Sequence, residues 1–170
     1  MTAHVDQAPV MPGAEAWSHQ GTKRLGALCI HGFTGNPSSM RGVAEAFAAA
    51  GFDVELPRLP GHGTAVSDML DTRWSHWSGE VEAAYQRLAS RCDKVVVAGL
   101  SMGGSLTLWT ALQHPEVSGI VCVNPAAQPQ AAEMIEMVEG LVADGTEVFP
   151  GIGSDIADQS VKESAYPETP

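Results

Sequence analysis

Basic residues are scarce in this sequence of 170 residues, which has nine lysines and arginines against 20 acidic residues and a formal net charge of −11. Phosphate groups are bound by clustered Lys and Arg, so this balance argues against nucleic acids and anionic membranes as partners. The acidic excess is uneven, because residues 126–170 hold nine acids and Lys162 as their only base. We therefore expect a boundary near Pro125, between a unit of residues 1–125 and an acidic segment of residues 126–170.

Long apolar runs are also lacking. No stretch approaches the roughly 20 residues that a membrane span needs, so we expect no stable membrane insertion. The start, MTAHVDQAPVMPGAEAW, has neither the basic nor the apolar region of a secretion signal, and we expect a cytoplasmic protein. The three cysteines, Cys29, Cys92 and Cys122, form no CxxC pair. Buried, reduced thiols are the expectation, with no metal site and no cofactor.

Short apolar runs alternate with helical patterns over residues 25–123. The expected strands are 25–30, 52–56, 94–99 and 118–123, with helices after Asn36, from Thr72 and over 102–114. Strands that are apolar throughout and alternate with helices indicate an α/β fold, in which a mostly parallel sheet is covered by helices on both faces. One helical stripe is assigned to core packing: Trp74, Trp77, Val81, Ala84, Tyr85 and Leu88.

A serine stands between glycines where the apolar run VVVAG gives way to helix. Gly99, Ser101 and Gly103 form a G-x-S-x-G pattern directly after a β-branched strand, which is the setting of a nucleophile elbow. Small residues are needed there because side chains flanking a serine at such a tight turn would clash. The turn also places Ser101 at a helix N-terminus, where backbone N–H groups stabilise an oxyanion. We predict that Ser101 is a nucleophile.

A tetrahedral oxyanion needs two hydrogen-bond donors. The N–H of Met102 is one, and the loop HGFTG at 31–35 follows an earlier strand and provides the N–H of Phe33 as the second. His31 and Gly32, which precede Phe33, are assigned to the support of this loop. The purely structural alternative is that HGFTG is only a turn and Ser101 only a helix cap. We favour the functional interpretation, because both patterns follow predicted strands in the expected order.

Four stretches in this order resemble one family: CIHGFTGNPSSM, LPRLPGHGT, TRWSHWSGEVEAAYQRL and VVVAGLSMGGSLTLW. They are similar to the carboxylesterase and monoacylglycerol lipase branch of bacterial α/β-hydrolases. The resemblance implies an α/β-hydrolase fold, Ser101 as nucleophile and the Phe33 and Met102 N–H groups as oxyanion hole. It also implies that the segment after Pro125 begins a lid over an acyl pocket. The helical stripe of that segment would then either face an acyl chain or pack the lid onto the core; its members are Met134, Met137, Val138 and Leu141.

Histidine is missing where the resembled family has its catalytic base. The family's triad runs in the order Ser, acid, His. Downstream of Ser101 the only histidine is His114, which a helix would place about 20 Å away, too far for a base. His31 and His62 stay open as alternatives. No acid is assigned to a triad. The resemblance thus implies that this sequence stops at Pro170 before the family's catalytic acid and histidine, either as a fragment of a longer hydrolase or as a natural short protein, and we expect an unpaired apolar sheet edge.

The expected function is that of a serine hydrolase cleaving carboxylic esters, with short or medium acyl chains and monoacylglycerols as the small-molecule substrates. Acyl transfer, thioester hydrolysis and perhydrolysis would use the same serine and oxyanion hole, so the motif leaves them open. A third alternative is an inactive protein that binds acyl ligands without a base. Oligomeric state leaves no trace in the sequence.

Overall fold

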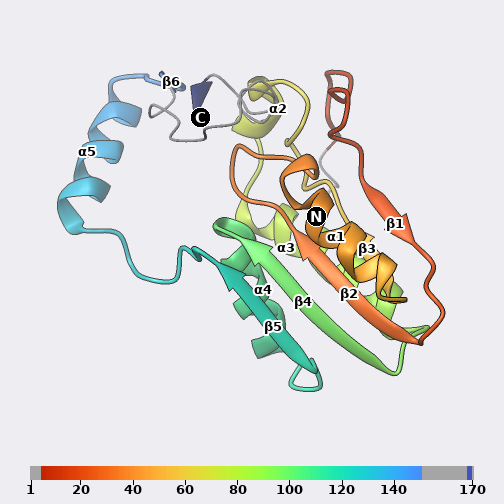
Figure 1. Cartoon of the computed structure of the whole chain (residues 1–170). Coiled ribbons are helices and arrows are strands. Elements are labelled where there is room, and N and C mark those ends of the chain that lie inside the picture. The colour runs from red at the N-terminus through yellow and green to blue at the C-terminus, as the bar shows by residue number, and fades with distance from the viewer. Residues whose placement is uncertain (1–4, 151–167, 170) are drawn as a thin grey trace.

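The computed structural model describes residues 5–150 and 168–169, and most of them surround one twisted sheet (Figure 1). The sheet has the order β1-β3-β2-β4-β5. Its strands are β1 (Trp17–His19), β2 (Leu25–Ile30), β3 (Asp53–Leu56), β4 (Lys94–Leu100) and β5 (Gly119–Val123). All neighbouring pairs are parallel except β1 with β3. The predicted, mostly parallel α/β sheet is thus confirmed.

Helices cover both faces of this sheet. The described residues form five helices: α1 (Ser38–Ala49), α2 (Val66–Leu70), α3 (Trp74–Ala89), α4 (Met102–Gln113) and α5 (Ala132–Ala143). In β2, Leu28 and Ile30 pack into one cluster with residues of α3 and α4, while Ala27 and Cys29 pack into a second cluster with residues of α1. Side chains alternate along a strand, so this apolar strand supplies a core on each side of the sheet.

The ends of the expected elements agree closely with the structure. Gly51 has φ +87° just after α1, as expected of a glycine that ends a helix. Asn36 accepts the N–H of Ser38 at 2.9 Å, and Pro37 precedes the first helical residue. Within the stripe of α3, Val81, Ala84, Tyr85 and Leu88 are buried. Trp77 packs against them, and Trp74 lies at the edge of the stripe with 42% of its surface exposed.

Two elements differ from the expectation. β1 and α2 were not predicted, because they have three and five residues and are too short to show a period. β5 lies at the edge of the sheet, and its Ile120, Val121 and Val123 are 43–51% exposed, in agreement with the expected unpaired apolar edge. No further strand pairs with β5 in the part of the chain that the structure describes.

The segment after Pro125 leaves the sheet (Figure 1). It includes α5, which has no buried residue. A second, two-stranded sheet pairs β6 (Phe149–Pro150) with β7 (Glu168–Thr169). The remaining part of the expected acidic lid, residues 151–167, lies outside the described residues, and the boundary at Pro125 stays a prediction.

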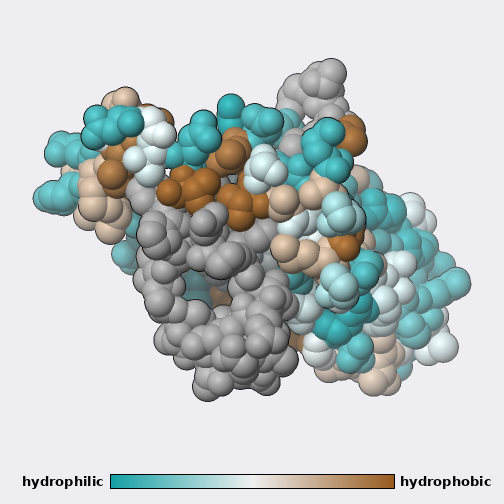
Figure 2. All heavy atoms as spheres, turned by 90° about the horizontal axis from the view of Figure 1, so that it is seen from above, coloured by the Kyte–Doolittle hydropathy of each residue, from teal (hydrophilic) through white to brown (hydrophobic). Residues whose placement is uncertain are grey.

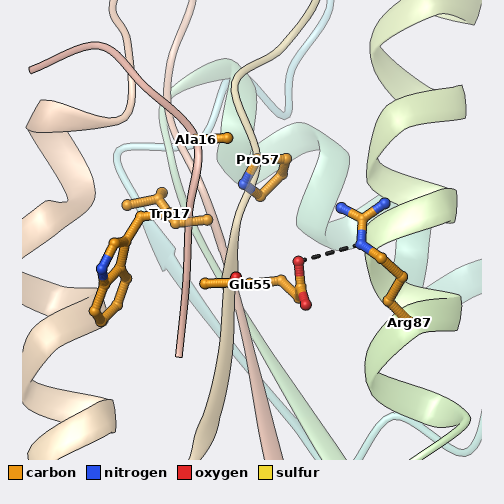
Figure 3. A pocket seen from close by; sticks show the side chains of 7 residues that line it. Ala16, Trp17, Glu55, Pro57 and Arg87 are labelled. Atoms are coloured by element: carbon orange, nitrogen blue, oxygen red, sulfur yellow. Dashed lines mark hydrogen bonds and ion pairs between the residues drawn. The ribbon is translucent and has the colours of Figure 1, made fainter. Parts of the chain in front are cut away.

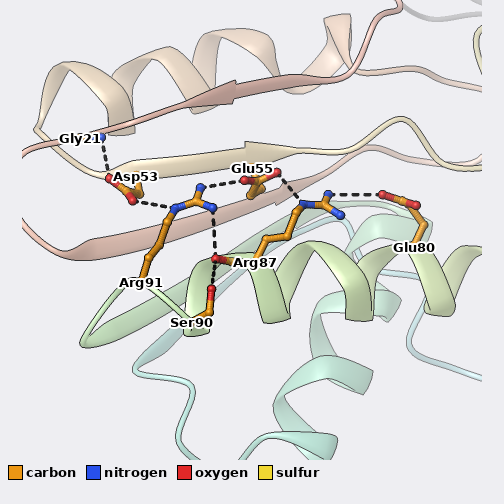
Figure 4. A network of polar contacts seen from close by, with 7 residues as sticks. All are labelled: Gly21, Asp53, Glu55, Glu80, Arg87, Ser90 and Arg91. Carbon is orange, nitrogen blue, oxygen red and sulfur yellow. Dashed lines mark hydrogen bonds and ion pairs between the residues drawn. The ribbon is translucent and has the colours of Figure 1, made fainter.

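Charged side chains fasten α3 to β3 (Figure 4). Asp53 and Glu55 lie two apart on the strand and therefore share one face, and Arg87 and Arg91 lie four apart on the helix. Arg91 contacts Asp53 at 2.8 Å and Glu55 at 2.7 Å, and Arg87 contacts Glu55 at 3.2 Å. Both carboxylates are nearly buried, and Arg91 lowers the pKa of Asp53 against the effect of its burial. The two acids of this inner strand are thus paired with arginines and are not left as unpaired buried charges.

A cavity of about 110 Å³ lies beside this network, between β1, β3 and α3. Figure 3 shows the Glu55 carboxylate pointing toward the Arg87 guanidinium, and the lining also includes Trp17 and Pro57. Ser101 is not among its lining residues.

Candidate active site

Ser101 occupies the turn between β4 and α4 in a backbone conformation that is rare for a residue with a side chain. Its φ is 54° and its ψ is −117°. The surrounding backbone fixes this conformation, because the Ser101 N–H donates to the Val123 carbonyl at 2.8 Å and the Ser101 carbonyl accepts the N–H of Gly104 at 2.8 Å. Strain of this kind persists only where neighbours enforce it, and it concentrates at functional sites.

The flanking glycines leave no room for a larger residue. A Cβ on Gly99 would lie 2.0 Å from the Gly103 carbonyl oxygen, and a Cβ on Gly103 would lie 2.3 Å from the Ile30 carbonyl oxygen. These distances are far below van der Waals contact. The start of α4 thus packs directly on the backbone of β2 and β4, as the small residues of the motif indicated.

The loop after β2 lies against the serine. A Cβ on Gly32 would lie 3.3 Å from the Ser101 Cβ and 3.2 Å from the Leu100 carbonyl oxygen. The structure therefore brings Gly32, Phe33 and Ser101 together at the carboxyl ends of β2 and β4. The N–H groups of Phe33 and Met102 donate no hydrogen bond to the part of the chain that the structure describes. Both N–H groups are therefore not engaged by the described part of the chain.

His31 is fully buried and holds the Gly32 carbonyl. The Leu59 N–H donates to His31 Nε2 at 3.1 Å, so that nitrogen has no proton, and Nδ1–H donates to the Gly32 oxygen at 3.0 Å. Burial, and then the neighbouring His62, lower the pKa of His31 to about 3. In a trans peptide the C=O of Gly32 and the N–H of Phe33 point in opposite directions. The bond from His31 therefore directs the Phe33 N–H away from the His31 ring.

His62 packs on the Gly32 loop as well. Its Nδ1–H donates to the Pro60 carbonyl at 3.0 Å, and the Trp77 indole donates to the same oxygen at 3.1 Å. Its ring meets those of His31, Phe33 and Trp77 edge-on, with centroids 5.1, 6.0 and 5.7 Å apart. Burial lowers the pKa of His62 to about 4. Both histidines are therefore neutral parts of the packing at pH 7.

None of the histidines in the described ranges, 5–150 and 168–169, hydrogen bonds to Ser101. His31 has both ring nitrogens engaged, so it is not free to accept a proton. His114 follows the last residue of α4, at the end remote from Ser101. There it contacts Glu82 at 2.7 Å and stacks on Tyr85. The distance argument against His114 thus agrees with its place in the structure.

Three of the four residues of the lid stripe are exposed, and the fourth, Leu141, is half-buried. Met134 is 47%, Met137 52% and Val138 42% accessible on α5, so these side chains are not packed into the core. Figure 2, seen from above, shows a small group of hydrophobic residues among hydrophilic ones on the described part of this face. Phe33 is 38% exposed.

Two contacts that hold the loop were not recognised in the sequence. Leu59 acts through its backbone N–H, which no side-chain pattern reveals, and Trp77 was assigned to the core stripe alone. No group of three or more His, Cys, Asp or Glu side chains that is able to hold a metal ion occurs among the described residues. None of the described helices is both long enough and apolar enough to span a membrane.

Residues 28–154 match the sequence pattern of the alpha/beta hydrolase fold. This match extends over most of the chain and includes both the Gly32 loop and the serine turn. The chain belongs to the α/β-hydrolase fold family.

Similar proteins include hydrolases of esters. Over 167 residues this α/β-hydrolase is 44% identical to a thermostable monoacylglycerol lipase of a Bacillus species, covering 97% of this chain and 64% of that protein. It is 28% identical to a carboxylesterase of Bacillus subtilis over 147 residues, covering 84% of this chain and 57% of that one. A solved structure from work on LipS and LipT, two metagenome-derived lipolytic enzymes, superimposes with a TM-score of 0.86 at 45% identity and covers 95% of this chain and 65% of that one. The chain thus spans less than two thirds of the length of each of these relatives.

Proposed function

We propose that this chain carries the nucleophile and the oxyanion hole of a hydrolase that cleaves carboxylic esters. The observation that carries the proposal is the conformation of Ser101, at φ 54° and ψ −117°, with the Gly32 loop packed against it. A strained serine at a strand-to-helix turn, beside two free N–H donors, is the arrangement that acyl transfer to serine needs.

The reaction starts at the hydroxyl of Ser101. Its oxygen attacks the ester carbonyl carbon, and the carbonyl oxygen becomes an oxyanion that accepts the N–H groups of Phe33 and Met102. Collapse of this intermediate breaks the bond to the alcohol, which leaves with a proton, and an acyl-serine remains. Water then attacks the acyl-serine and releases the acid. Neither step oxidises or reduces any atom, so the reaction as written needs no redox cofactor.

The proton of Ser101 needs an acceptor, because an un-ionised serine is a weak nucleophile. His31 and His62 are both buried and hydrogen bonded to backbone groups, and neither ring hydrogen bonds to Ser101. We therefore assign the two histidines to the support of the oxyanion hole, and we assign the base to no described residue.

The proposed substrates are small uncharged esters of short or medium acyl chains, including monoacylglycerols. The likeness to the Bacillus monoacylglycerol lipase supports this substrate class. The exposed apolar side chains of Met134, Met137 and Val138 on α5 are proposed to contribute contacts to the acyl chain.

The test compares hydrolysis of p-nitrophenyl butyrate and of a monoacylglycerol by the protein as the cell makes it and by two serine variants. Ser101→Ala removes the nucleophile and is expected to lower kcat by at least about 10³-fold. Ser105→Ala, one helical turn further on, removes only a hydrogen bond to the Ala126 carbonyl and is expected to keep kcat within about threefold. Full activity of Ser101→Ala would refute the proposal. Faster turnover of a thioester with the same acyl group would move the substrate class from esters to thioesters.

A further inference from the structure

We propose that Asp6 is a positioning residue for the oxyanion hole. It acts through a loop, residues 57–63, that lies between the N-terminal segment and the ring of His31. This inference rests on the proposed function, because it assigns to Asp6 an effect on the step in which the oxyanion forms.

The carboxylate of Asp6 holds this loop at two points. One oxygen accepts the Gly61 N–H at 2.8 Å, and the other pairs with Arg58 at 2.5 Å. The same Arg58 nitrogen donates to the His62 carbonyl at 2.8 Å. The side chains of Asp6 and Arg58 are only 12% and 20% exposed, so solvent screens the pair little.

The loop in turn holds the site. The Leu59 N–H fixes His31 Nε2, and the His62 ring packs against the rings of His31 and Phe33. His31 Nδ1–H then fixes the Gly32 carbonyl and hence the direction of the Phe33 N–H. A continuous series of short contacts thus connects Asp6 to one of the two proposed oxyanion donors.

Other contacts keep the N-terminal segment in place when Asp6 is changed. The Met11 N–H donates to the Gly63 carbonyl at 2.8 Å. The side chain of Asp68 accepts the N–H groups of Gln7 at 2.9 Å and Ala8 at 3.1 Å. Ala14 is fully buried. A variant of Asp6 is therefore expected to fold while its loop is held less firmly.

The expected effect is on kcat rather than on KM. An oxyanion hole acts where charge develops in the transition state, so a misdirected donor slows the chemical step without weakening substrate binding. Loss of a whole donor typically costs about 10²–10³-fold in kcat, and a loosened one costs less. We expect Asp6→Ala to lower kcat about tenfold with KM within about twofold. Asp6→Asn keeps an acceptor for the Gly61 N–H and is expected to have a smaller effect.

The matched control is Asp93→Asn. Asp93 also pairs with an arginine, Arg24, at 2.6 Å, but both side chains are about two-thirds exposed. These residues precede β4 and β2, at the end of the strands opposite Ser101. This variant is expected to leave kcat and KM within about twofold of the original values.

The experiment measures kcat per active site on the protein as the cell makes it, with sites counted by a fluorophosphonate, and hydrogen exchange of peptides covering 31–35 and 57–63. The inference predicts slower turnover per site and faster exchange in Asp6→Ala, with neither change in Asp93→Asn. Unchanged turnover per site, or a loss of activity matched by a loss of titratable sites, would overturn it. If the original protein neither hydrolyses esters nor reacts with the phosphonate, the proposed function fails. In that case hydrogen exchange alone tests whether the loop depends on Asp6. Unchanged exchange in Asp6→Ala would refute that dependence as well.

Discussion

Lowering the pH from 7 to 5 is expected to destabilise the folded protein through its two buried histidines, His31 and His62. Both are fully buried beside one another, and burial is the main cause that lowers their pKa values to about 3 and about 4, from 6.5. Between pH 6.5 and pH 4 the unfolded chain therefore binds protons at these two histidines that the folded protein does not bind. Their contribution to stability is complete above pH 6.5 and is lost as the pH falls toward 4 and then 3.

The size of the effect follows from the same values. A pH of 5 lies about 1.5 units below the pKa of a histidine in the unfolded chain. At about 1.4 kcal/mol per unit, protonation of one histidine therefore stabilises the unfolded chain by about 2 kcal/mol. The folded form gains almost nothing from protons at this pH. Two histidines together thus remove about 4 kcal/mol, a large part of the roughly 5–15 kcal/mol by which domains are stable.

Urea unfolding at pH 7 and at pH 5, followed by tryptophan fluorescence, measures this loss. His62→Gln removes one of the two groups, so the difference in unfolding free energy between the two pH values is expected to fall by about 2 kcal/mol. His19→Gln changes an exposed histidine on β1 and is expected to leave the difference unchanged. A protein equally stable at both pH values, or a His62→Gln variant with an undiminished difference, would refute the reasoning.

Two further predictions concern stability and are checked by urea unfolding. Gly103→Ala places a Cβ 2.3 Å from a backbone oxygen of β2 and is expected to cost more than about 3 kcal/mol, whereas Gly42→Ala, in open space on α1, is expected to stabilise by about 0.5–1 kcal/mol; equal effects would contradict the packing of the elbow. Arg91→Ala leaves nearly buried Asp53 without its arginine and is expected to cost about 2 kcal/mol. Arg24→Ala, in an exposed pair, is expected to cost less, and the reverse order would contradict the account of the network.

The elements around the serine could be predicted from sequence because each is strongly patterned. The apolar runs of β2 and β4 and the glycines at 99 and 103 permit few alternatives, and the structure has both strands within one residue of their predicted ends. The buried charges of Asp53 and Glu55 were not recognised as a feature. Their spacing of two, opposite Arg87 and Arg91 at a spacing of four, is a pattern that would have revealed them.

The support of the oxyanion loop could not be predicted in the same way. The proton of His31 lies on Nδ1 because a backbone N–H 28 residues further on binds Nε2, and nothing local in the sequence indicates that contact. The exposure of α5 likewise depends on which surfaces meet in three dimensions, whereas an apolar pattern shows only which faces favour burial.

The most direct test of the central claim is covalent labelling of the protein, as the cell makes it, with a fluorophosphonate, followed by mass spectrometry of its peptides. The account predicts one adduct, on Ser101, that is absent from Ser101→Ala and present in Ser105→Ala. An unlabelled protein, or an adduct on another residue that persists in Ser101→Ala, would contradict the assignment of Ser101 as the nucleophile.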